Sequence, residues 1–548
     1  MESVKGTVAV VGAGPSGLCM LKALRADGFC VTLYERRKNV GGLWAYSDNP
    51  AYTTALPGVT RANLSKFTCG FADFPIPDKY PTYMEPHEFQ EFMEDYARHF
   101  GLLKDICFEA NVQLVRGQRP AVEKNGHVET AEFDKVALCH GYQTKANIPT
   151  FEGQDKFEGT ILHSQAYRRQ FRDKTVVVVG LSSTAGDVIP DLMPVASKVY
   201  VSHRRGALPF RRYHNGTPTD LGITWRRRQL DQFLTRYFPR LGKWLADAAI
   251  PLLCRRAFGY ALDPAWRLEP FPSITLNLPQ FFELVLPYLR DSSLTSLHGL
   301  TRFTGPKSVE FADGTVLNDV DAVVLCTGYT ADWSIAAPFV ETSRPVFAIP
   351  NLKKEYGGPP LYWLYMNLFP PRYADSCVVV CYHAFGKSNG FSFADVMAWA
   401  VSNIWRGNEP LPPREAMEKH IDAHQDWIAA RWAADCSADT SAVKQWEFQQ
   451  WLHRAAGTGM ESLGWGYKGW MFWWKDRRMY NLMNDGVETA HLFSFFETGR
   501  RPTWDGAREA IIHQNEVVRD MFPLKEIPWP FGDASMSEKL EGCRSPSV

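Results

Sequence analysis

The first 35 residues carry two apolar runs separated by a helical spacing of leucines. Residues 8–11 are uninterruptedly apolar and β-branched or small, as in a buried parallel strand. Leu18, Leu21 and Leu24 then recur at helical spacing, and residues 30–34 form a second apolar run. The pattern predicts a strand–helix–strand unit at the start of the chain.

The same kind of unit returns in the middle of the chain. Residues 175–179 are a second strand-like run, and residues 322–325 are a third. Between them, the basic and aromatic segment 225–256 is expected to be helical, and Asp313-Gly314 is a hairpin signal. Residues 414–434 predict a further helix.

Glycines follow the first apolar run in the order G-x-G-x-x-G. Gly12 permits a tight turn, Gly14 allows the backbone to approach a pyrophosphate, and Gly17 allows the helix to pack on the strand. Glu35 ends the second strand, 23 residues after Gly12, where a carboxylate can accept hydrogen bonds from a ribose. The ordered set predicts a dinucleotide site.

The second unit carries a variant of this turn. Gly180 keeps the first glycine, whereas Ser182 and Ala185 stand at the second and third positions and remain small. No acid stands 23 residues after Gly180; His203 is there, followed by Arg204 and Arg205. Because a guanidinium can bind a 2′-phosphate that a carboxylate would repel, we expect NADPH rather than NADH here, with a solvated basic loop as the alternative.

Composition excludes several other classes. Sixty Lys and Arg balance sixty Asp and Glu, which argues against nucleic-acid binding. The 45% hydrophobic content is ordinary for a globular protein. Eleven cysteines, an odd number without C-x-x-C, indicate neither a disulfide framework nor a zinc site, so no metal is expected.

No targeting or membrane-spanning segment is recognisable. The first apolar run leads directly into glycines rather than a cleavage site, and the best apolar candidate, residues 244–254, is short and contains Asp247 and Pro251. We therefore expect a soluble, cytoplasmic protein that binds no membrane. The tail 535–548 is polar and expected to fray.

Several motifs resemble flavin-containing monooxygenases, the class B flavoprotein monooxygenases of the dimethylaniline N-oxide-forming type. Gly41-Gly42-Leu43-Trp44 is placed as in flavoproteins that bring this backbone close to FAD. Residues 157–167 read F-x-G-x-x-x-H-x-x-x-Y, with His163 and Tyr167 four apart, and match the identifying sequence of this family. The likeness continues through segments 61–75, 214–226, 326–329, 361–371 and 499–511, without the apolar C-terminal anchor of animal members.

This resemblance implies an enzyme with FAD at the first site and NADPH at the second. The family reduces FAD with NADPH, forms a C4a-hydroperoxyflavin with O2 and oxygenates a soft N or S centre of a small organic molecule. Asn63 resembles the amide that the family places beside the flavin ring, with a turn-forming Asn as the alternative. For FAD, the resemblance and the motifs indicate Gly12, Gly14, Pro15, Ser16, Gly17, Glu35, Gly42, Leu43, Trp44, Ala62, Asn63, Thr327 and Gly328. For NADPH they indicate Gly180, Ser182, Ser183, Thr184, Ala185, Arg204 and Arg205.

The fold implied is α/β, with two Rossmann-like dinucleotide-binding domains. We expect the NADPH domain, residues 171–325, to be inserted into a discontinuous FAD domain, residues 1–170 and 326–407. A helical, Trp-rich region at 408–520 and a polar tail at 521–548 would follow. Nine of the 18 Trp lie in 408–520, including Trp470 and Trp474, and either pack against the flavin domain or wall a substrate tunnel.

Other functions stay open. Baeyer–Villiger oxygenation of a ketone uses the same cofactors, although Tyr167 fits the heteroatom-oxygenating fingerprint and no W-Y-W-N-x-Y-P-G motif occurs. Arg61 could supply the cation that such a reaction needs. An NADPH oxidase or reductase and a non-catalytic flavoprotein are further alternatives, and a homo-oligomer is also left open. Asp395 and Trp399 stand where the family usually has Gln and Arg, and we expect a structural role for His163.

Overall fold

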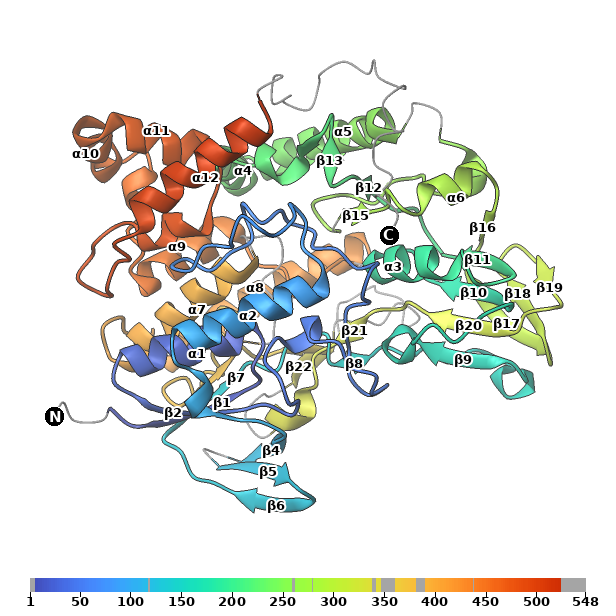
Figure 1. The fold of residues 1–548 in the computed structure, drawn as a ribbon, viewed down its shortest axis with the longest axis horizontal. Coiled ribbons are helices and arrows are strands. Elements are labelled where there is room, and N and C mark those ends of the chain that lie inside the picture. The colour runs from blue at the N-terminus through green and yellow to red at the C-terminus, as the bar shows by residue number, and fades with distance from the viewer. Residues whose placement is uncertain are drawn as a thin grey trace.

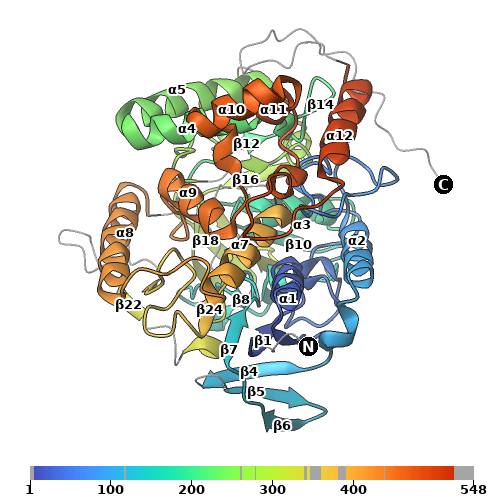
Figure 2. The same ribbon diagram turned by 90° about the vertical axis from the view of Figure 1, so that its left-hand side faces the viewer.

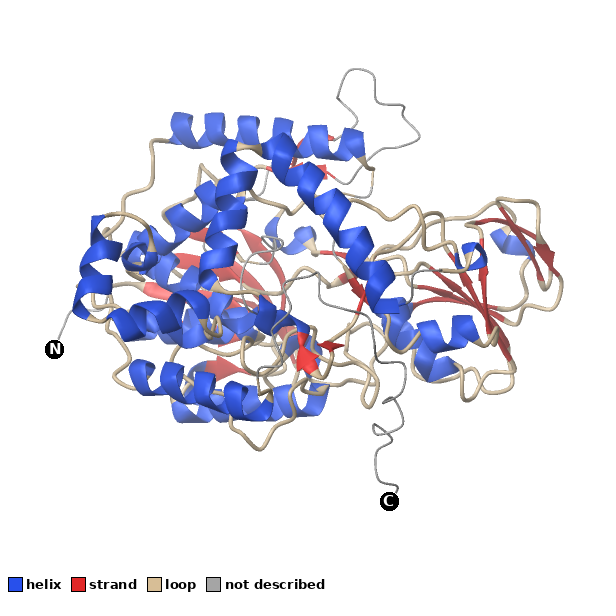
Figure 3. Ribbon diagram, turned by 90° about the horizontal axis from the view of Figure 1, so that it is seen from above, coloured by secondary structure: helices blue, strands red, loops and turns tan. Residues whose placement is uncertain are grey.

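The computed structural model describes residues 5–116, 119–258, 262–277, 279–337, 342–345, 360–380, 390–436 and 438–523. Two parallel five-stranded sheets lie at opposite ends of the molecule, with helices gathered above the first (Figure 1). Figure 3, from above, shows the narrower end that holds the second sheet. The polar tail expected from the sequence lies outside the described residues from residue 524 onward.

The first sheet has the order β24-β7-β1-β2-β3. Its strands are β1 (Thr7–Val11), β2 (Cys30–Tyr34), β3 (Ile106–Cys107), β7 (Lys135–Leu138) and β24 (Cys377–Val379). Val8 and Val10 face the core under α1 (Pro15–Ala26), α2 (Pro86–His99) and α7 (Gly390–Trp405). Ala9 and Val11 face the antiparallel sheet of β4 (Asn111–Arg116), β5 (Arg119–Lys124) and β6 (His127–Thr130). The apolar run thus serves two cores because alternate residues point to opposite faces.

The second sheet has the order β16-β11-β10-β20-β9. Its strands are β9 (Thr160–His163), β10 (Thr175–Val179), β11 (Lys198–Ser202), β16 (Leu294–Leu297) and β20 (Ala322–Leu325). One face packs on α3 (Ser183–Leu192) and α6 (Leu286–Arg290), and the other on β17 (Leu300–Gly305), β18 (Ser308–Phe311) and β19 (Val316–Leu317). Gly314, with φ +82°, turns the chain between β18 and β19 where Asp313-Gly314 predicted a hairpin.

The chain crosses between the two sheets twice. It leaves the first sheet after β7 through β8 (Lys145–Ala146) and returns after β20 through β21 (Tyr329–Thr330), and these two strands pair with each other. The insertion expected from the sequence is therefore confirmed. The second sheet includes β9, so its first strand lies before residue 171, where we had placed the start of the inserted domain.

The remaining α-helices of the described chain are α4 (Trp225–Tyr237), α5 (Pro239–Phe258), α8 (Arg414–Ala434), α9 (Gln445–Ala456), α10 (Tyr467–Lys475), α11 (Arg477–Asp485) and α12 (Ala507–Met521). The helix predicted at 414–434 is confirmed as α8. Figure 2 shows α1 and α7 close together under α9, as their contacts also show. Short strands β12 to β15, β22 and β23 complete the described elements: Pro209–Phe210, Tyr213–His214, Thr217–Pro218, Gln280–Phe281, Thr342–Pro345 and Pro360–Tyr362.

A buried ion pair joins α1 to α7. Lys22 lies 3.3 Å from Asp395 and 2.6 Å from Asp73, and Asp395 also accepts a hydrogen bond from the Ala72 backbone N–H at 2.8 Å. Asp395 is fully buried. The acid that departs from the family pattern is therefore part of the core rather than an exposed side chain.

The tryptophans of the C-terminal region do not share one environment. Trp451 is buried among Phe448, Phe393 and the first core, as packing against the flavin domain predicted. Trp470 and Trp474 are 65% and 80% exposed, so core packing is wrong for these two, and the tunnel wall stays a prediction. Helical spacing identifies an apolar face of a helix but does not show what covers it.

No helix in the described ranges combines the length and the hydrophobicity that crossing a bilayer requires.

Candidate active site

At the end of β1, the first glycine turn packs against the start of α1 and against the backbone of Cys139. Gly12 has φ +99°, and a Cβ on Gly17 would lie 1.8 Å from the Gly12 carbonyl oxygen, so the helix packs tightly on the turn. Pro15 begins α1 and Ser16 follows it, which leaves the first N–H groups of the helix unpaired with earlier carbonyls. This is the geometry that binds a pyrophosphate.

A second glycine segment closes on this turn. Gly42 begins a short 3-10 turn that continues through Leu43 and Trp44, and a Cβ on Gly42 would lie 3.2 Å from Gly14 Cα. The Gly41 N–H donates to the Ala13 carbonyl oxygen at 3.0 Å. The two motifs, 28 residues apart, therefore form one cradle without side chains.

Glu35 is held rigidly at this cradle. It is buried just beyond β2, where its two carboxylate oxygens accept backbone hydrogen bonds from Ala13 at 2.6 Å and Arg37 at 2.8 Å. The Arg37 guanidinium in turn donates to the carbonyl oxygens of Gly42 and Thr53, both at 2.7 Å. The residues present thus fit an adenine dinucleotide whose ribose meets Glu35 and whose pyrophosphate meets the glycines.

Asn63 lies on a loop of the first domain that contacts the second domain. Its side chain is exposed, while the neighbouring Ala62 is buried. Three residues earlier, Thr60 donates a hydrogen bond to Asp187 of α3 at 2.8 Å. The loop of the first domain is thereby fixed to the first helix of the second domain, with Asn63 beside the junction.

Arg212, which the sequence motifs did not indicate, anchors this loop. Its guanidinium donates to the Ala62 carbonyl oxygen at 2.8 Å, to the Arg61 carbonyl oxygen at 3.0 Å and to Asn63 Oδ1 at 3.3 Å. It also forms an ion pair with Glu283, whose Oε2 is buried without a hydrogen-bond partner. Arg61 itself pairs with Glu85. The cation that reaches Asn63 is therefore Arg212, not Arg61.

The second glycine turn follows β10 as the sequence predicts. Gly180 has φ +106°, and a Cβ there would lie 2.4 Å from the Cys326 carbonyl oxygen. Ser182 is the N-cap of α3, Ser183 and Thr184 form its first turn, and Ala185 is buried under it. Ser182 and Ser183 donate hydrogen bonds to Gln280 at 3.2 Å and 2.7 Å. The N-terminus of α3 is thus exposed beside a neutral amide, as an anion site needs.

Thr327 and Gly328 lie just after β20, the strand of the second sheet that ends at Leu325. Cys326, between that strand and Thr327, contacts Gly180, and Gly328 has φ +88°. Thr327 donates to the Asn147 carbonyl oxygen at 2.5 Å, where the chain crosses between the sheets.

His163 and Tyr167 do not share a helical face, although they are four residues apart. His163 ends β9, and a single 3-10 turn separates it from Tyr167. His163 Nε2 bonds the Gly328 carbonyl oxygen at 3.0 Å, and burial lowers the His163 pKa. Tyr167 donates to Asp191 of α3 at 2.8 Å. The family fingerprint therefore braces the second domain at its crossing, which is the structural role expected for His163.

The two arginines of the second site differ. Arg204 is exposed, with its stem against Gly299, whereas Arg205 is 3.1 Å from Asp435 at the end of α8. His203 is buried between the Arg205 carbonyl oxygen and Ser296, at 2.6 Å and 2.8 Å. Arg204 is thus the freer of the two to meet a 2′-phosphate.

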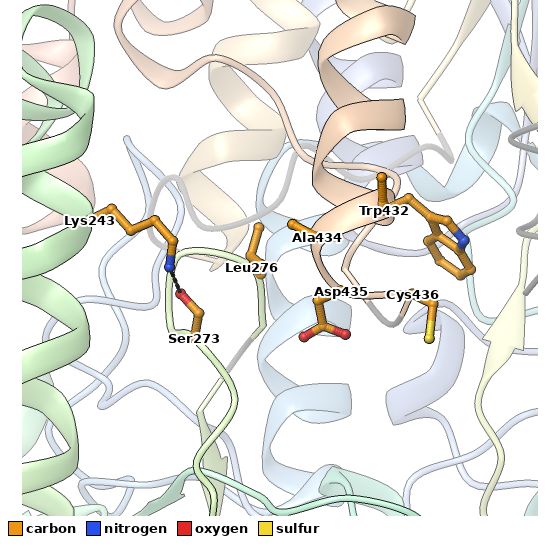
Figure 4. A pocket seen from close by; sticks show the side chains of 8 residues that line it. Lys243, Ser273, Leu276, Trp432, Ala434, Asp435 and Cys436 are labelled. Carbon is orange, nitrogen blue, oxygen red and sulfur yellow. Dashed lines mark hydrogen bonds between the residues drawn. The ribbon is translucent and has the colours of Figure 1, made fainter. Parts of the chain in front are cut away.

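A cavity of about 510 Å³ lies beside Arg205 (Figure 4). Its lining residues are Lys243, Ser273, Leu276, Trp432, Ala433, Ala434, Asp435 and Cys436. Asp435 connects it to Arg205, and Lys243 donates a hydrogen bond to Ser273 at 3.2 Å. The cavity lies beside the second site and includes none of the glycine-turn residues.

Comparisons with known proteins identify the family of this chain and several relatives. The family described as flavin-binding monooxygenase-like matches residues 5–528. Monooxygenase aurF of Gibberella zeae is 32% identical, covering 93% of this chain and 97% of its own. Dimethylaniline monooxygenase [N-oxide-forming] 4 of Rattus norvegicus is 28% identical over 98% of this chain and 92% of its own.

Two solved structures share the fold. S-allyl-L-cysteine S-oxygenase from Allium sativum has a TM-score of 0.58 and 20% identity, covering 93% of this chain and 99% of its own. An open structure of cyclohexanone monooxygenase has a TM-score of 0.57 and 17% identity, covering 83% and 98%. At these identities the likeness establishes the two-domain architecture.

Proposed function

Since this chain belongs to the flavin-binding monooxygenase-like family and is an FAD- and NADPH-dependent monooxygenase, we propose that it oxygenates a soft nitrogen or sulfur centre of a small organic molecule. The observation that carries the proposal is the pairing of both cations near Asn63. Arg61 is held by Glu85, and Arg212 is held by Glu283.

This pairing favours an electrophilic over a nucleophilic oxygen transfer. Attack on a ketone needs a negatively charged oxygen, and an unpaired buried charge is very costly. A guanidinium already neutralised by a carboxylate is less able to hold that anion. Amines and sulfides need no such cation because they supply the electron pair themselves. The relative from Rattus norvegicus is named for N-oxide formation, which agrees with this choice.

Each of the two glycine turns is proposed to bind a different cofactor. We assign FAD to the Gly12–Gly17 turn with Glu35 and Gly42, and NADPH to the Gly180 turn with Arg204. When bound, the flavin supplies the redox and oxygen-activating chemistry that the side chains lack. The protein contributes position and electrostatics.

Asn63 is the residue that we assign to the reacting centre. Its amide is neutral, so it can orient a reactant without adding charge to a site where negative charge develops. Arg212 fixes the backbone that immediately precedes Asn63 through the Arg61 and Ala62 carbonyl oxygens. It acts as a positioning residue for Asn63.

Product analysis tests the proposal. The holoenzyme is offered a tertiary amine, a thioether and a cyclic ketone with NADPH and O2, and products are identified by mass and NMR. We expect an N-oxide or S-oxide. Lactone formation without any N- or S-oxide would replace the proposal with Baeyer–Villiger oxygenation, and hydrogen peroxide alone would indicate an NADPH oxidase.

Substitution of Asn63 by Asp tests its role separately. A carboxylate there should disfavour the developing negative charge, so product formation falls while FAD retention and NADPH oxidation persist. Loss of FAD as the main effect would make Asn63 a structural residue.

A further inference from the structure

A second cavity, of about 140 Å³, lies between α8 and the start of α9. Helix α8 contributes His420 and His424 to its lining, and the start of α9 contributes Lys444 and Glu447. Its described lining includes no residue of the glycine turns or of the loop around Asn63. The cavity is therefore separate from the candidate active site.

The two histidines of this cavity are held neutral, and one of them has an unused nitrogen. Their rings are nearly parallel, at 11°, with centroids 6.4 Å apart. Burial lowers the pKa of both His420 and His424, that of His424 to about 3, and the positive charge of Lys444 adds to this effect. Nδ1 of His420 is buried without a hydrogen-bond partner. Because either nitrogen of a neutral imidazole can carry the proton, Nδ1 can donate it to a bound oxygen atom.

The charge of the cavity argues against a metal ion. Two histidines four residues apart on a helix are also a metal-binding pattern. Over the ranges that the structure describes, however, no three His, Cys, Asp or Glu side chains form a group that could hold a metal. Glu447, the acid of this lining, is paired with Arg236 at 2.6 Å, and the Lys444 ammonium would repel a cation. An anion is therefore the favoured occupant.

Lys444 supplies a positive charge for such an anion. It is the N-cap residue of α9, and its side chain makes no capping hydrogen bond. The first N–H groups of a helix lack partners within the helix, and their partial positive charge adds to that of Lys444. Arg431 is the other cation that lowers the His424 pKa, but the charge of Asp439 acts on Arg431 in the opposite direction. The cavity thus offers about one positive charge to a ligand.

Apolar side chains form much of the remaining lining, among them Met366, Val443 and Phe448. Met366 and Asn367 both have a left-handed backbone, with φ +52° and +56°, which non-glycine residues rarely adopt. The Asn367 amide donates to the Ser441 carbonyl oxygen at 3.1 Å, which holds this wall against the segment before α9. The cavity therefore combines a polar end with an apolar wall.

We propose that this cavity binds a small organic monocarboxylate. The carboxylate would lie between Lys444 and Nδ1 of His420, and its short apolar tail would contact Met366, Val443 and Phe448. Inorganic phosphate carries more than one negative charge at neutral pH, so part of its charge would lack a partner in this partly apolar cavity. Pockets for drug-sized ligands measure about 300–1,000 Å³, so a volume of about 140 Å³ indicates a short-chain acid.

Calorimetric titration of the FAD-loaded enzyme with butyrate tests the proposal. Acetate and inorganic phosphate are titrated in parallel at the same ionic strength and at neutral pH. We expect one saturable site for butyrate, weaker binding of acetate because its tail is shorter, and weaker binding of phosphate. Butyrate should also raise the melting temperature, because it binds the folded state.

Two variants locate the site. Lys444→Ala should raise the Kd for butyrate by roughly 10- to 150-fold, because it removes a charge-assisted hydrogen bond. His420→Phe keeps a ring but removes the donor, so it should also weaken butyrate binding. The control is Lys419→Ala, which removes an exposed lysine of α8 that does not line the cavity and should bind butyrate like the unchanged protein. All three variants should keep their flavin absorbance and NADPH oxidation.

Absence of saturable butyrate binding would overturn the proposal, as would an unchanged Kd in Lys444→Ala. Phosphate that binds as tightly as butyrate would identify a general anion site instead. Stoichiometric binding of Zn²⁺ that His420→Phe loses would identify a metal site, and either result would also overturn the proposal. None of these outcomes depends on which atom of a substrate the enzyme oxygenates.

Discussion

Arg212 Nη2 lies 3.3 Å from Asn63 Oδ1, although the two residues are 149 positions apart in the chain. The same guanidinium donates to the carbonyl oxygens of Arg61 and Ala62. A side chain of the inserted domain thus sets the backbone of the loop that carries the candidate reacting-centre amide. Coupling of NADPH oxidation to product should therefore depend on Arg212.

We expect Arg212→Lys to lower the ratio of product formed to NADPH oxidised by about tenfold. An ammonium cannot reproduce the planar fork that reaches two carbonyl oxygens and Asn63 at once, and each lost charge-assisted hydrogen bond is worth about 1.5–3 kcal/mol. Product, hydrogen peroxide and NADPH are measured together. Arg211→Ala, one residue earlier, is the control and should keep its coupling. Unchanged coupling in Arg212→Lys would contradict a positioning role.

Substitution of Gly14 by alanine and substitution of Gly17 by alanine should impair the protein for different reasons. A Cβ on Gly17 would lie 1.8 Å from the Gly12 carbonyl oxygen, so Gly17→Ala should prevent α1 from packing on β1 and give little folded protein. A Cβ on Gly14 would meet Gly42 Cα at 3.7 Å, an ordinary contact, so Gly14→Ala should fold but lose FAD. Circular dichroism and flavin absorbance of both variants separate these outcomes. A yellow, FAD-retaining Gly14→Ala protein would place the pyrophosphate elsewhere.

Arg204 should determine the preference for NADPH more strongly than Arg205. Loss of one charge-assisted hydrogen bond to the 2′-phosphate weakens binding by roughly 10- to 150-fold, so Arg204→Ala should raise the Kd for NADPH by this factor and leave NADH unchanged. Asp435→Asn should instead lower the Kd for NADPH modestly, because it releases Arg205 from its ion pair. Both constants are measured by titration of flavin-loaded enzyme. If Arg204→Ala weakened the binding of NADPH and NADH equally, Arg204 could no longer be assigned to the 2′-phosphate.

Asp187 should make stability fall as pH rises between about 4 and 6. Burial raises the Asp187 pKa to about 6, above the value of about 3.9 for an unfolded chain. In this window the folded state therefore binds more protons than the unfolded state, and the stability present at low pH is lost as pH rises through the folded pKa.

The amide introduced by Asp187→Asn cannot ionise, so this variant should gain about 1–3 kcal/mol at about pH 7.5, and the gain should shrink toward about pH 5. Melting temperatures of both proteins across this pH range provide the measurement. Asp191→Asn on the same helix removes the partner of Arg169 and should lose stability instead. A pH-independent difference for Asp187→Asn would contradict the burial argument.

Local patterns predicted the parts of the fold whose causes are local. The first strand, glycine turn and helix follow from consecutive residues, and so does α8. The insertion could be predicted because the strand-and-glycine pattern returns once and residues 322–325 close it.

The sequence-based predictions were wrong or incomplete where residues distant in the chain determine the local structure. A spacing of four between His163 and Tyr167 is compatible with a helix, but pairing of β9 with β20 makes His163 the end of a strand. Arg212 and Glu283 belong to no motif, and only the packing of the inserted domain brings them to Asn63. Likewise, the apolar spacing in α10 was recognisable in the sequence, but its exposure to solvent was not.

The pairing of β24 with β7 fixes an order of events during synthesis. Strand β7 ends at Leu138 and β24 begins at Cys377, and all of the second sheet is encoded between them. The ribosome thus delivers every strand of the inserted sheet before the strand that completes the first. At roughly 5–20 residues per second, one edge of β7 waits on the order of 10–50 s for its neighbour. Throughout this interval the nascent enzyme carries an open strand edge, which other chains can pair with unless it is shielded.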